Sequence, residues 1–347
     1  MRPSLWRNTK YALSVLLTLV LIGSSVAIAA QPSDPSPHAI DIPGWFKSSF
    51  LDFRDDIAEA AKERKRMMIY FGQDGCPYCR ELMRVNFSQK DIVEKTRRNL
   101  DAVAVNIWGD REVTWLDRKR YSEKSFAALL KIQFTPTVLF LDEKGNVVLR
   151  LNGYQPPHKF ALALDYAAGR HETSSTFAEY LVRYAREPAS GQLHDEPFFM
   201  RPPYDFARTR KGGRPLAILF EQKDCAACDE LHRTGFREKE VSALVGKLDV
   251  ARLELFGRAP LVTPSGKRST EAEWARDLNV SYTPSILFFD AQGREVFRIE
   301  AYVRTFHLAS GIDYVVSGAY RKEPSFQRYV QARAGKIREA GGRVEIW

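Results

Sequence analysis

Residues 66–79 read RMMIYFGQDGCPYC, and residues 216–228 read LAILFEQKDCAAC. Each stretch joins a short apolar run, rich in strand-forming residues, to a CxxC motif that opens a helical stretch. A strand that leads directly into a helix is the first part of an α/β unit. The two stretches therefore predict two copies of one unit, each with a cysteine pair at its strand-to-helix junction.

Further landmarks recur at nearly the same displacement as the cysteines, which is 149 residues. The run FTPTVLFLD at residues 134–142 recurs as YTPSILFFD at residues 282–290, displaced by 148 residues. Self-similarity at a near-constant displacement is the mark of internal duplication. The chain is therefore predicted to hold two domains of the same fold.

Each copy reads as β-α-β-α-β-β-α, an α/β fold with a mixed sheet flanked by helices. After the first strand, the predicted elements are helices 77–87 and 226–233, strands 102–107 and 249–255, helices 122–132 and 270–278, two hairpin strands ending at 147–151 and 295–299, helices 158–168 and 305–317, and final helices 175–185 and 325–334. Residues 53–64 add a leading helix, for which the second copy shows no counterpart. The predicted domains are residues 38–187 and 215–347, with a Pro- and Gly-containing linker at residues 188–214.

The first 30 residues have the pattern of an export signal. Arg2, Arg7 and Lys10 precede the apolar run of residues 11–22, and Ala27-Ile28-Ala29 offers small residues for a signal peptidase. The alternative is an uncleaved anchor, because residues 11–30 could just span a bilayer. Either interpretation places the remaining chain outside the cytoplasm, and a signal peptide at residues 1–30 predicts the periplasm.

Composition and charge exclude several classes of protein. The chain is 44% hydrophobic and 27% charged, which is ordinary for a globular protein and argues against a collagenous, coiled-coil or disordered chain. The net charge of +9 falls to +6 without the first 30 residues, and no basic patch interleaved with aromatic residues is present. No nucleic-acid partner is expected. No nucleotide fingerprint or phosphate loop appears either, so no cofactor is predicted.

The chain has four cysteines, and all of them lie in the two CxxC pairs. Unpaired N–H groups and the dipole at the first turn of a helix favour a thiolate, which is the attacking species in disulfide exchange. Cys76 and Cys225 are therefore the predicted nucleophiles. Cys79 and Cys228, three residues on, are placed to resolve the mixed disulfide.

Two Thr-Pro pairs supply a second element of the site. Thr135-Pro136 and Thr283-Pro284 follow the first cysteine of each copy by the same interval, directly before an apolar strand. A proline is tolerated at the first position of a strand, which is the alternative explanation. Its recurrence at a matching distance from CxxC instead predicts a cis-proline that faces the dithiol. The backbone of each threonine would then pair with a substrate strand.

With these motifs in place, both copies resemble thioredoxin-fold domains over nearly the whole chain after the signal. The first copy most resembles periplasmic thioredoxin-like proteins of the SoxW type, and its Cys-Pro-Tyr-Cys matches the glutaredoxin dipeptide, so Pro77 and Tyr78 join the predicted substrate contacts. The resemblance implies a periplasmic thiol-disulfide oxidoreductase and favours a reductase. Such a reductase would act on protein disulfides and would depend on a membrane thiol-electron donor.

The sequence departs from the thioredoxin pattern in one respect that bears on mechanism. Thioredoxins carry a buried Asp six residues before the first cysteine, where it serves proton transfer to the resolving thiol. Tyr70 and Leu219 occupy those positions here. The resemblance therefore does not carry that proton-transfer step over to either copy.

Charges flanking the two motifs differ in sign. Arg80 and Arg84 follow the first pair, whereas Asp224, Asp229 and Glu230 surround the second. Negative charge opposes formation of a thiolate. The first pair is therefore predicted to be the more reactive of the two.

Other interpretations of the cysteines were weighed. The 145 residues between Cys79 and Cys225 far exceed the spacing of zinc ligands, and Arg80 and Asp229 stand where covalent haem needs histidine. The six histidines show no metal-ligand spacing, and His232 is expected to face solvent. A non-catalytic client-binding or docking protein with structural disulfides remains an alternative, above all for the second pair. A disulfide-forming oxidase or isomerase also remains open.

Overall fold

The computed structural model describes residues 40–185, 188–209, 213–300 and 303–344. The predicted signal peptide at residues 1–30 lies outside these ranges. Among the described residues, none of the helices has the length and hydropathy that a bilayer crossing requires. Residues from Pro37 onward form one unit, which holds both copies of the repeat.

Strand β1 (Arg66–Gly72) is the centre of the first sheet, and all seven of its residues are buried. It pairs in parallel with β2 (Leu100–Asn106) and antiparallel with β5 (Thr137–Leu141), and β6 (Val147–Asn152) completes the order β2-β1-β5-β6. A strand that is apolar without alternation is buried on both faces of its sheet. The RMMIYFG run therefore calls for helices on both sides.

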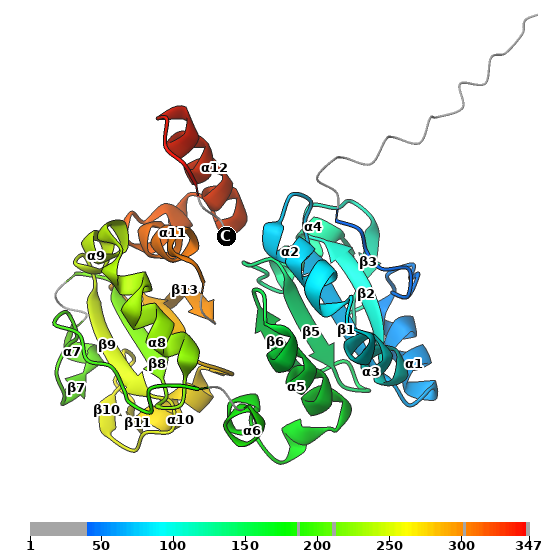
Figure 1. Cartoon of the computed structure of the whole chain (residues 1–347), viewed down its shortest axis with the longest axis horizontal. Coiled ribbons are helices and arrows are strands. Elements are labelled where there is room, and N and C mark those ends of the chain that lie inside the picture. Colours follow the sequence, from blue (N-terminus) through cyan, green and yellow to red (C-terminus); the bar gives the residue numbers. More distant parts are fainter. Residues whose placement is uncertain (1–39, 186–187, 210–212, 301–302, 345–347) are drawn as a thin grey trace, which may run out of the picture. The chain divides into compact units, whose positions relative to one another are not determined.

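Helices cover both faces of this sheet (Figure 1). The helical elements of the first half are α1 (Phe53–Lys62), α2 (Pro77–Glu81), the π-helix η1 (Leu82–Asn86), α3 (Lys90–Asn99), α4 (Glu123–Leu129), α5 (Pro157–Ala168), the 3-10 turn η2 (His171–Thr173) and α6 (Phe177–Tyr184). On one face, Phe53 of α1 and Phe126 of α4 pack against Ile69. On the other, Leu82 and Phe160 pack against Tyr70. This sandwich confirms the predicted α/β fold.

The second half repeats the arrangement, with sheet order β13-β12-β8-β9. Its elements are β7 (Tyr204–Asp205), α7 (Phe206–Thr209), β8 (Leu216–Glu221), α8 (Ala226–Arg233), η4 (Gly235–Arg237), α9 (Lys239–Val245), β9 (Asp249–Glu254), β10 (Pro260–Val262), β11 (Arg268–Thr270), α10 (Glu271–Asp277), β12 (Ser285–Phe289), β13 (Glu295–Glu300), α11 (Thr305–Val316), η5 (Ala319–Arg321) and α12 (Phe326–Glu339). The duplication is also visible in detail. The β5–β6 and β12–β13 pairs each shift register once, after Phe140 and after Phe288.

The hairpin turns repeat as well. Gly145 and Gly293 have φ angles of 85° and 74°, which a residue with a side chain rarely adopts. Both glycines follow the strands that the Thr-Pro pairs open. The predicted turns at residues 143–146 and 291–294 are therefore confirmed.

Some elements differ from the sequence-based expectation. The helix predicted at residues 77–87 is α2 followed by a π-helix, and a short β3–β4 hairpin (Glu112–Thr114, Arg120–Ser122) was not foreseen. The second copy does have a counterpart of the leading helix, the single turn α7. Its Phe206 lies 5.5 Å from the ring of Trp274, as Phe53 lies 5.4 Å from Phe126 in the first copy.

Part of the segment expected as a linker packs on the second sheet. Phe199 is buried, the N–H of Met200 donates to the carbonyl of Val250 at 2.8 Å, and β7 pairs in parallel with β10. This segment has no periodic apolar pattern, since isolated aromatic residues rather than a regular face attach it. Composition alone therefore marked it as a connection.

The two halves exchange aromatic residues at equivalent positions of the repeat. Tyr282 belongs to the core of the first half, where its hydroxyl accepts a hydrogen bond from the N–H of Asn152 at 2.8 Å. Phe134 belongs to the core of the second half, with its ring 5.2 Å from Phe326. Both residues directly precede a Thr-Pro pair. The sequence prediction that they form core or groove wall is confirmed.

Candidate active site

The first dithiol lies where β1 leads into α2. Cys76 is the N-cap of α2, and Pro77 takes the first helical position, where its missing N–H costs no hydrogen bond. The Cys76 sulfur accepts a hydrogen bond from the N–H of Cys79 at 3.1 Å, and the two cysteines form a disulfide. Cys76 is 4% exposed and Cys79 is fully buried. The exposed order matches an attacking and a resolving cysteine.

The Thr-Pro loop faces this dithiol. The carbonyl oxygen of Thr135 lies 3.5 Å from the Cys76 sulfur, and the Thr135–Pro136 peptide bond is cis. Thr283–Pro284 is also cis, as predicted, and a further cis bond joins Pro202 to Pro203. The geometry brings the predicted residues together, while the substrate-binding role of the loops stays a prediction.

Gln73 is a site residue that the sequence reasoning missed. Its amide nitrogen donates to the Thr135 hydroxyl at 3.1 Å and to the side-chain oxygen of Gln327 at 2.8 Å. Its own oxygen accepts from the indole N–H of Trp108 at 2.5 Å. Gln73 therefore fixes the loop that faces Cys76. Gln222 stands at the same place before the second motif, and this repetition is the signal that could have identified the position.

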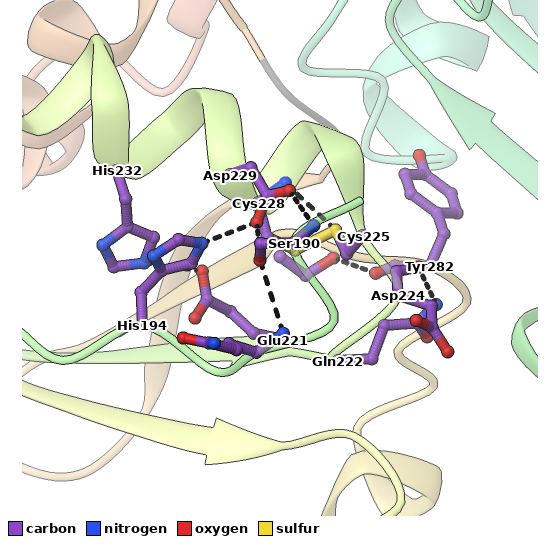
Figure 2. Close-up of a disulfide and its surroundings, with 12 residues drawn as sticks. Ser190, His194, Glu221, Gln222, Asp224, Cys225, Cys228, Asp229, His232 and Tyr282 are labelled. Atoms are coloured by element: carbon purple, nitrogen blue, oxygen red, sulfur yellow. Dashed lines mark hydrogen bonds and ion pairs between the residues drawn. A yellow bond between two sulfur atoms is a disulfide. The ribbon is translucent and has the colours of Figure 1, made fainter. Parts of the chain in front are cut away.

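The second dithiol lies at the start of α8 and repeats the local geometry (Figure 2). Cys225 is the N-cap, its sulfur accepts from the N–H of Cys228 at 3.0 Å, and the two cysteines form a disulfide. Cys225 is 5% exposed and Cys228 is 2% exposed. Helix N-termini therefore support both predicted nucleophiles in the same way.

Both dithiols line a cavity of about 760 Å³. Cys76, Tyr78 and Thr135 reach it from the first half, and Cys225 and Thr283 reach it from the second. Apolar side chains of α6 and α12 also line it, among them Leu181, Val182, Val330 and Ala334. Apolar walls with a few convergent polar groups are typical of a binding site.

Ring contacts lie beside the first motif. The ring of Tyr78 meets His307 of α11 edge-on, at 5.3 Å between centroids. Burial lowers the pKa of His307 to about 4, so this histidine is neutral at physiological pH. Tyr78 therefore meets an uncharged aromatic neighbour inside the cavity.

The charges around the two motifs are more nearly balanced than the sequence suggests. Arg84 pairs with Glu81 at 2.8 Å, which takes up part of its charge. Asp229 accepts hydrogen bonds from the N–H and hydroxyl of Ser190, both at 2.7 Å, and lies 2.6 Å from the Nε2 of His194. Burial raises the pKa of Asp229, but these partners outweigh it and lower the pKa below its usual value. Asp229 is therefore ionised.

We expect Cys76 to be alkylated faster than Cys225, by about twofold to tenfold, because exposed charges at this range contribute only fractions of a kcal/mol each. The measurement is the iodoacetamide rate at pH 7 in two reduced single-cysteine chains, which retain only Cys76 or only Cys225. Equal rates, or a faster Cys225, would contradict the predicted order.

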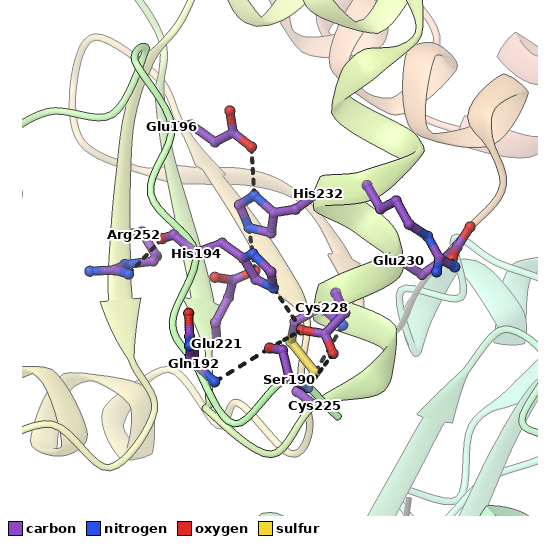
Figure 3. Close-up of polar contacts among 12 residues, drawn as sticks. Ser190, Gln192, His194, Glu196, Glu221, Cys225, Cys228, Glu230, His232 and Arg252 are labelled. Carbon is purple, nitrogen blue, oxygen red and sulfur yellow. Dashed lines mark hydrogen bonds and ion pairs between the residues drawn. A yellow bond between two sulfur atoms is a disulfide. The ribbon is translucent and has the colours of Figure 1, made fainter. Parts of the chain in front are cut away.

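One sequence expectation is wrong. His232 does not face solvent: it is 2% exposed, on the inner face of α8 (Figure 3). Its two ring nitrogens lie 2.9 Å from Glu196 and 2.8 Å from Glu221, and both carboxylates are buried. Helical spacing from Cys228 to His232 was a usable signal, since residues four apart share a face. Glu196 lies in the expected linker, so no local pattern pointed to it.

The position that carries the buried acid in thioredoxins holds Tyr70 in the first copy. Its hydroxyl is buried without a hydrogen-bond partner, and burial raises the pKa of this group well above its usual value. Leu219 is equally buried in the second copy. Among the described residues no cluster of three His, Cys, Asp or Glu side chains is suited to a metal ion.

Comparisons with known proteins agree with this geometry. The family description "Thioredoxin-like domain" matches residues 53–168 and again residues 202–315. A thioredoxin-fold protein from Helicobacter pylori is 24% identical over 35% of this chain and 79% of its own, with a TM-score of 0.30. A thioredoxin from Thermus thermophilus is 24% identical over 34% of this chain and 85% of its own, with a TM-score of 0.27. The reduced C-terminal domain of Neisseria meningitidis DsbD is 12% identical over 31% of this chain and 88% of its own, with a TM-score of 0.25. No curated protein matches the chain.

Proposed function

Because the chain belongs to the thioredoxin-like family, with two copies of its domain, we propose that it is an exported thiol-disulfide oxidoreductase that reduces protein disulfides. The observation that carries the proposal is the setting of Cys76. Its sulfur caps α2, accepts the N–H of Cys79 and lies 3.5 Å from the carbonyl of Thr135. A nucleophile, a resolving thiol and a backbone edge for the substrate meet at one point.

The chemistry follows from this arrangement. In the reduced protein, the Cys76 thiolate attacks one sulfur of a client disulfide, and the other client sulfur leaves as a thiolate. The Cys79 thiol then loses its proton and attacks the Cys76 sulfur. The second client sulfur leaves with the electron pair of the mixed disulfide. The client has gained two electrons, and the Cys76–Cys79 disulfide must be reduced again by a donor.

The cavity supports a polypeptide client. It offers apolar walls beside both Thr-Pro loops, and the free backbone of an extended segment can pair with the threonine at such a loop. Cys225, Cys228 and Thr283 repeat the arrangement. The second dithiol is therefore proposed to act as a further exchange site for the same client or as a relay to the first.

Export and direction rest on the sequence. The charged, apolar and small-residue segments of the first 30 residues support a periplasmic location. The resemblance of the first copy to SoxW-type proteins supports the reductive direction. Because the periplasm is kept oxidising, a reductase there requires a membrane thiol-electron donor.

The direction is tested by the reduction potential of each pair in the full chain. We expect the chain with Cys225→Ser and Cys228→Ser to equilibrate near thioredoxin's potential, about −270 mV, in a dithiothreitol redox buffer. The converse chain, with Cys76→Ser and Cys79→Ser, reports the second pair. A first-pair potential near about −120 mV would instead identify an oxidant and overturn the reductive assignment.

A further inference from the structure

A buried acid–base cluster lies behind the second dithiol and has no counterpart behind the first. It consists of Glu196, Glu221 and His232, which we call the Glu–His–Glu cluster (Figure 3). The three side chains are between 1% and 3% exposed. Burying ionisable groups is costly unless they are paired, and disulfide chemistry at the outer surface of α8 does not need them. A structural role for so many buried charges has no evident gain.

The cluster lies beneath the first turns of α8. Leu219 and Glu221 point to the same face of β8, because side chains alternate along a strand. Leu219 packs in the same core as Leu231 of α8, so this face is the one that the helix covers. Cys228 and His232 are one helical turn apart on the inner side of α8. Glu221 therefore lies under the helical segment that begins with the dithiol (Figure 2).

The hydrogen bonds fix the charge state of the cluster. A carboxylate only accepts hydrogen bonds, so both ring nitrogens of His232 donate and the ring is an imidazolium. Burial has the largest effect on the pKa of His232 and lowers it, but the two carboxylates together raise it above the usual value. Glu196 is also held by Arg237, at 2.8 and 3.0 Å. Two carboxylates thus face two cations.

One atom of the cluster is left without a partner. Oε1 of Glu221 accepts from His232, whereas Oε2 is buried and makes no hydrogen bond. A buried carboxylate oxygen is normally satisfied, because an unpaired one costs free energy. Oε2 is therefore free to accept a proton from a neighbouring group that changes state.

Other charged groups surround the cluster on every side. His194 stacks on the His232 ring with centroids 4.4 Å apart, and its Nε2 lies 2.6 Å from Asp229, the residue after Cys228. Arg252 of β9 donates to the carbonyl of His194 at 2.6 Å. With Arg237 from η4, the sheet, the helix and the segment before β8 each contribute an ionisable neighbour.

The first copy provides the contrast. Its equivalents of Glu221 and His232 are Gly72 and Met83, neither of which ionises. A Cβ atom on Gly72 would collide with the hydroxyl of Tyr70, which fills that space. The same strand and helix therefore hold neutral groups behind Cys79 and an acid–base pair behind Cys228.

We propose that Glu221, held in place by His232, is the proton acceptor for the resolving thiol of Cys228. The proposal rests on disulfide exchange at the second dithiol. After Cys225 has formed a mixed disulfide with a client, the Cys228 thiol passes its proton to Oε2 of Glu221 and attacks the Cys225 sulfur. The client sulfur leaves with the electron pair of the broken bond. Cys225 and Cys228 end as a disulfide, the client is reduced by two electrons, and the proton stays on Glu221.

The test follows the resolving step directly. The full chain with Cys76→Ser and Cys79→Ser is reduced, mixed with oxidised glutathione and quenched with acid at set times. Mass spectrometry separates the reduced, singly glutathionylated and disulfide forms, which yields the attack and resolving rate constants. With Glu221→Gln, we expect the resolving rate at pH 7 to fall at least about tenfold, within the range that a proton acceptor contributes. The glutathionylated form then accumulates.

The pH profile separates proton transfer from a structural effect. Cys228 ionises unaided once the pH exceeds the thiol pKa, so the gap between the Glu221→Gln and parent chains should close near pH 9. The matched control is Glu230→Gln, which removes one carboxylate from the partly exposed side of the same helix. It is expected to leave the resolving rate within about twofold. Equal profiles for a folded Glu221→Gln chain and its parent overturn the proposal.

A second comparison needs no change in the cluster. The chain with Cys225→Ser and Cys228→Ser reports the first dithiol, behind which Gly72, Tyr70 and Met83 supply no acceptor. Its resolving rate should fall about tenfold per pH unit below the thiol pKa, whereas that of the second dithiol should stay nearly level between pH 6 and 8. Identical profiles overturn the proposal even if Glu221→Gln does not fold. If glutathione never forms a mixed disulfide with Cys225, the exchange function of the second dithiol fails as well.

Discussion

With Cys76→Ser, we expect reduction of a protein disulfide at the first site to fall by at least about a thousandfold, because the only thiolate that can attack there is lost. Cys79 does not replace it, since its sulfur is fully buried whereas Cys76 reaches the cavity. The measurement is the reduction of insulin disulfides with dithiothreitol as donor. It is made in a chain that also carries Cys225→Ser and Cys228→Ser, so that only the first site reports.

The matched control is Cys79→Ser in the same background. This change leaves attack by Cys76 intact but removes the resolving thiol, so a mixed disulfide between Cys76 and insulin should accumulate and be visible on a non-reducing gel. Undiminished turnover with Cys76→Ser would exclude the assigned nucleophile. Failure to trap insulin with Cys79→Ser would exclude the assigned order of the two cysteines.

The strands and helices that form the site were open to prediction because their signals are local. The apolar run of residues 66–72 shows no alternation, which indicates a strand covered on both faces. The CxxC that follows sits at a helix start, and Gly145 marks a hairpin turn. Each of these patterns lies within about ten residues of sequence. Their repetition in the second half turned separate weak signals into one fold.

The Glu–His–Glu cluster could not be predicted, because it depends on residues brought together by the tertiary fold. Glu196 lies in a Pro-containing segment with no period, and only the packing of Phe199 brings it to His232. The prediction that His232 faces solvent followed from its distance to Cys225 and ignored its spacing from Cys228. A charged residue at the end of an apolar strand, Glu221, was the one local sign that the helix above it hides a polar partner.

The largest expected effect on stability concerns Arg66, the first residue of β1. It is 5% exposed, and its guanidinium donates to the carbonyl of Ala167 at 2.7 Å, to Glu172 at 2.7 Å and to Glu143 at 3.2 Å. It thereby ties the strand to the end of α5 and to the turn after β5. The second copy has Pro215 at this position, so the arrangement belongs to the first domain alone.

We expect Arg66→Met to lower the free energy of unfolding of the first domain by about 2–4 kcal/mol at pH 7. Removing one member of a buried ion pair costs about 3–5 kcal/mol when the partner charge stays buried, and here Glu143 and Glu172 can partly rehydrate. The measurement is urea unfolding followed by near-UV circular dichroism. Arg170→Met is the matched control, since Arg170 is an exposed partner of the same Glu143 and should cost less than about 1 kcal/mol.

The pH dependence of this difference checks its cause. Burial alone would raise the pKa of Glu143, but hydrogen bonds from Arg66 and Arg170 lower it to about 2, below its ordinary value of 4.5. A carboxyl whose pKa is depressed in the folded state contributes stability above its unfolded pKa and loses it as the pH falls through the folded value. The gap between the parent and Arg66→Met should therefore be full at pH 5 and above and should narrow between about pH 4.5 and 2. A gap that is independent of pH would show that Arg66 stabilises the domain by packing and by its bond to Ala167, because the ion pair with Glu143 would then contribute nothing.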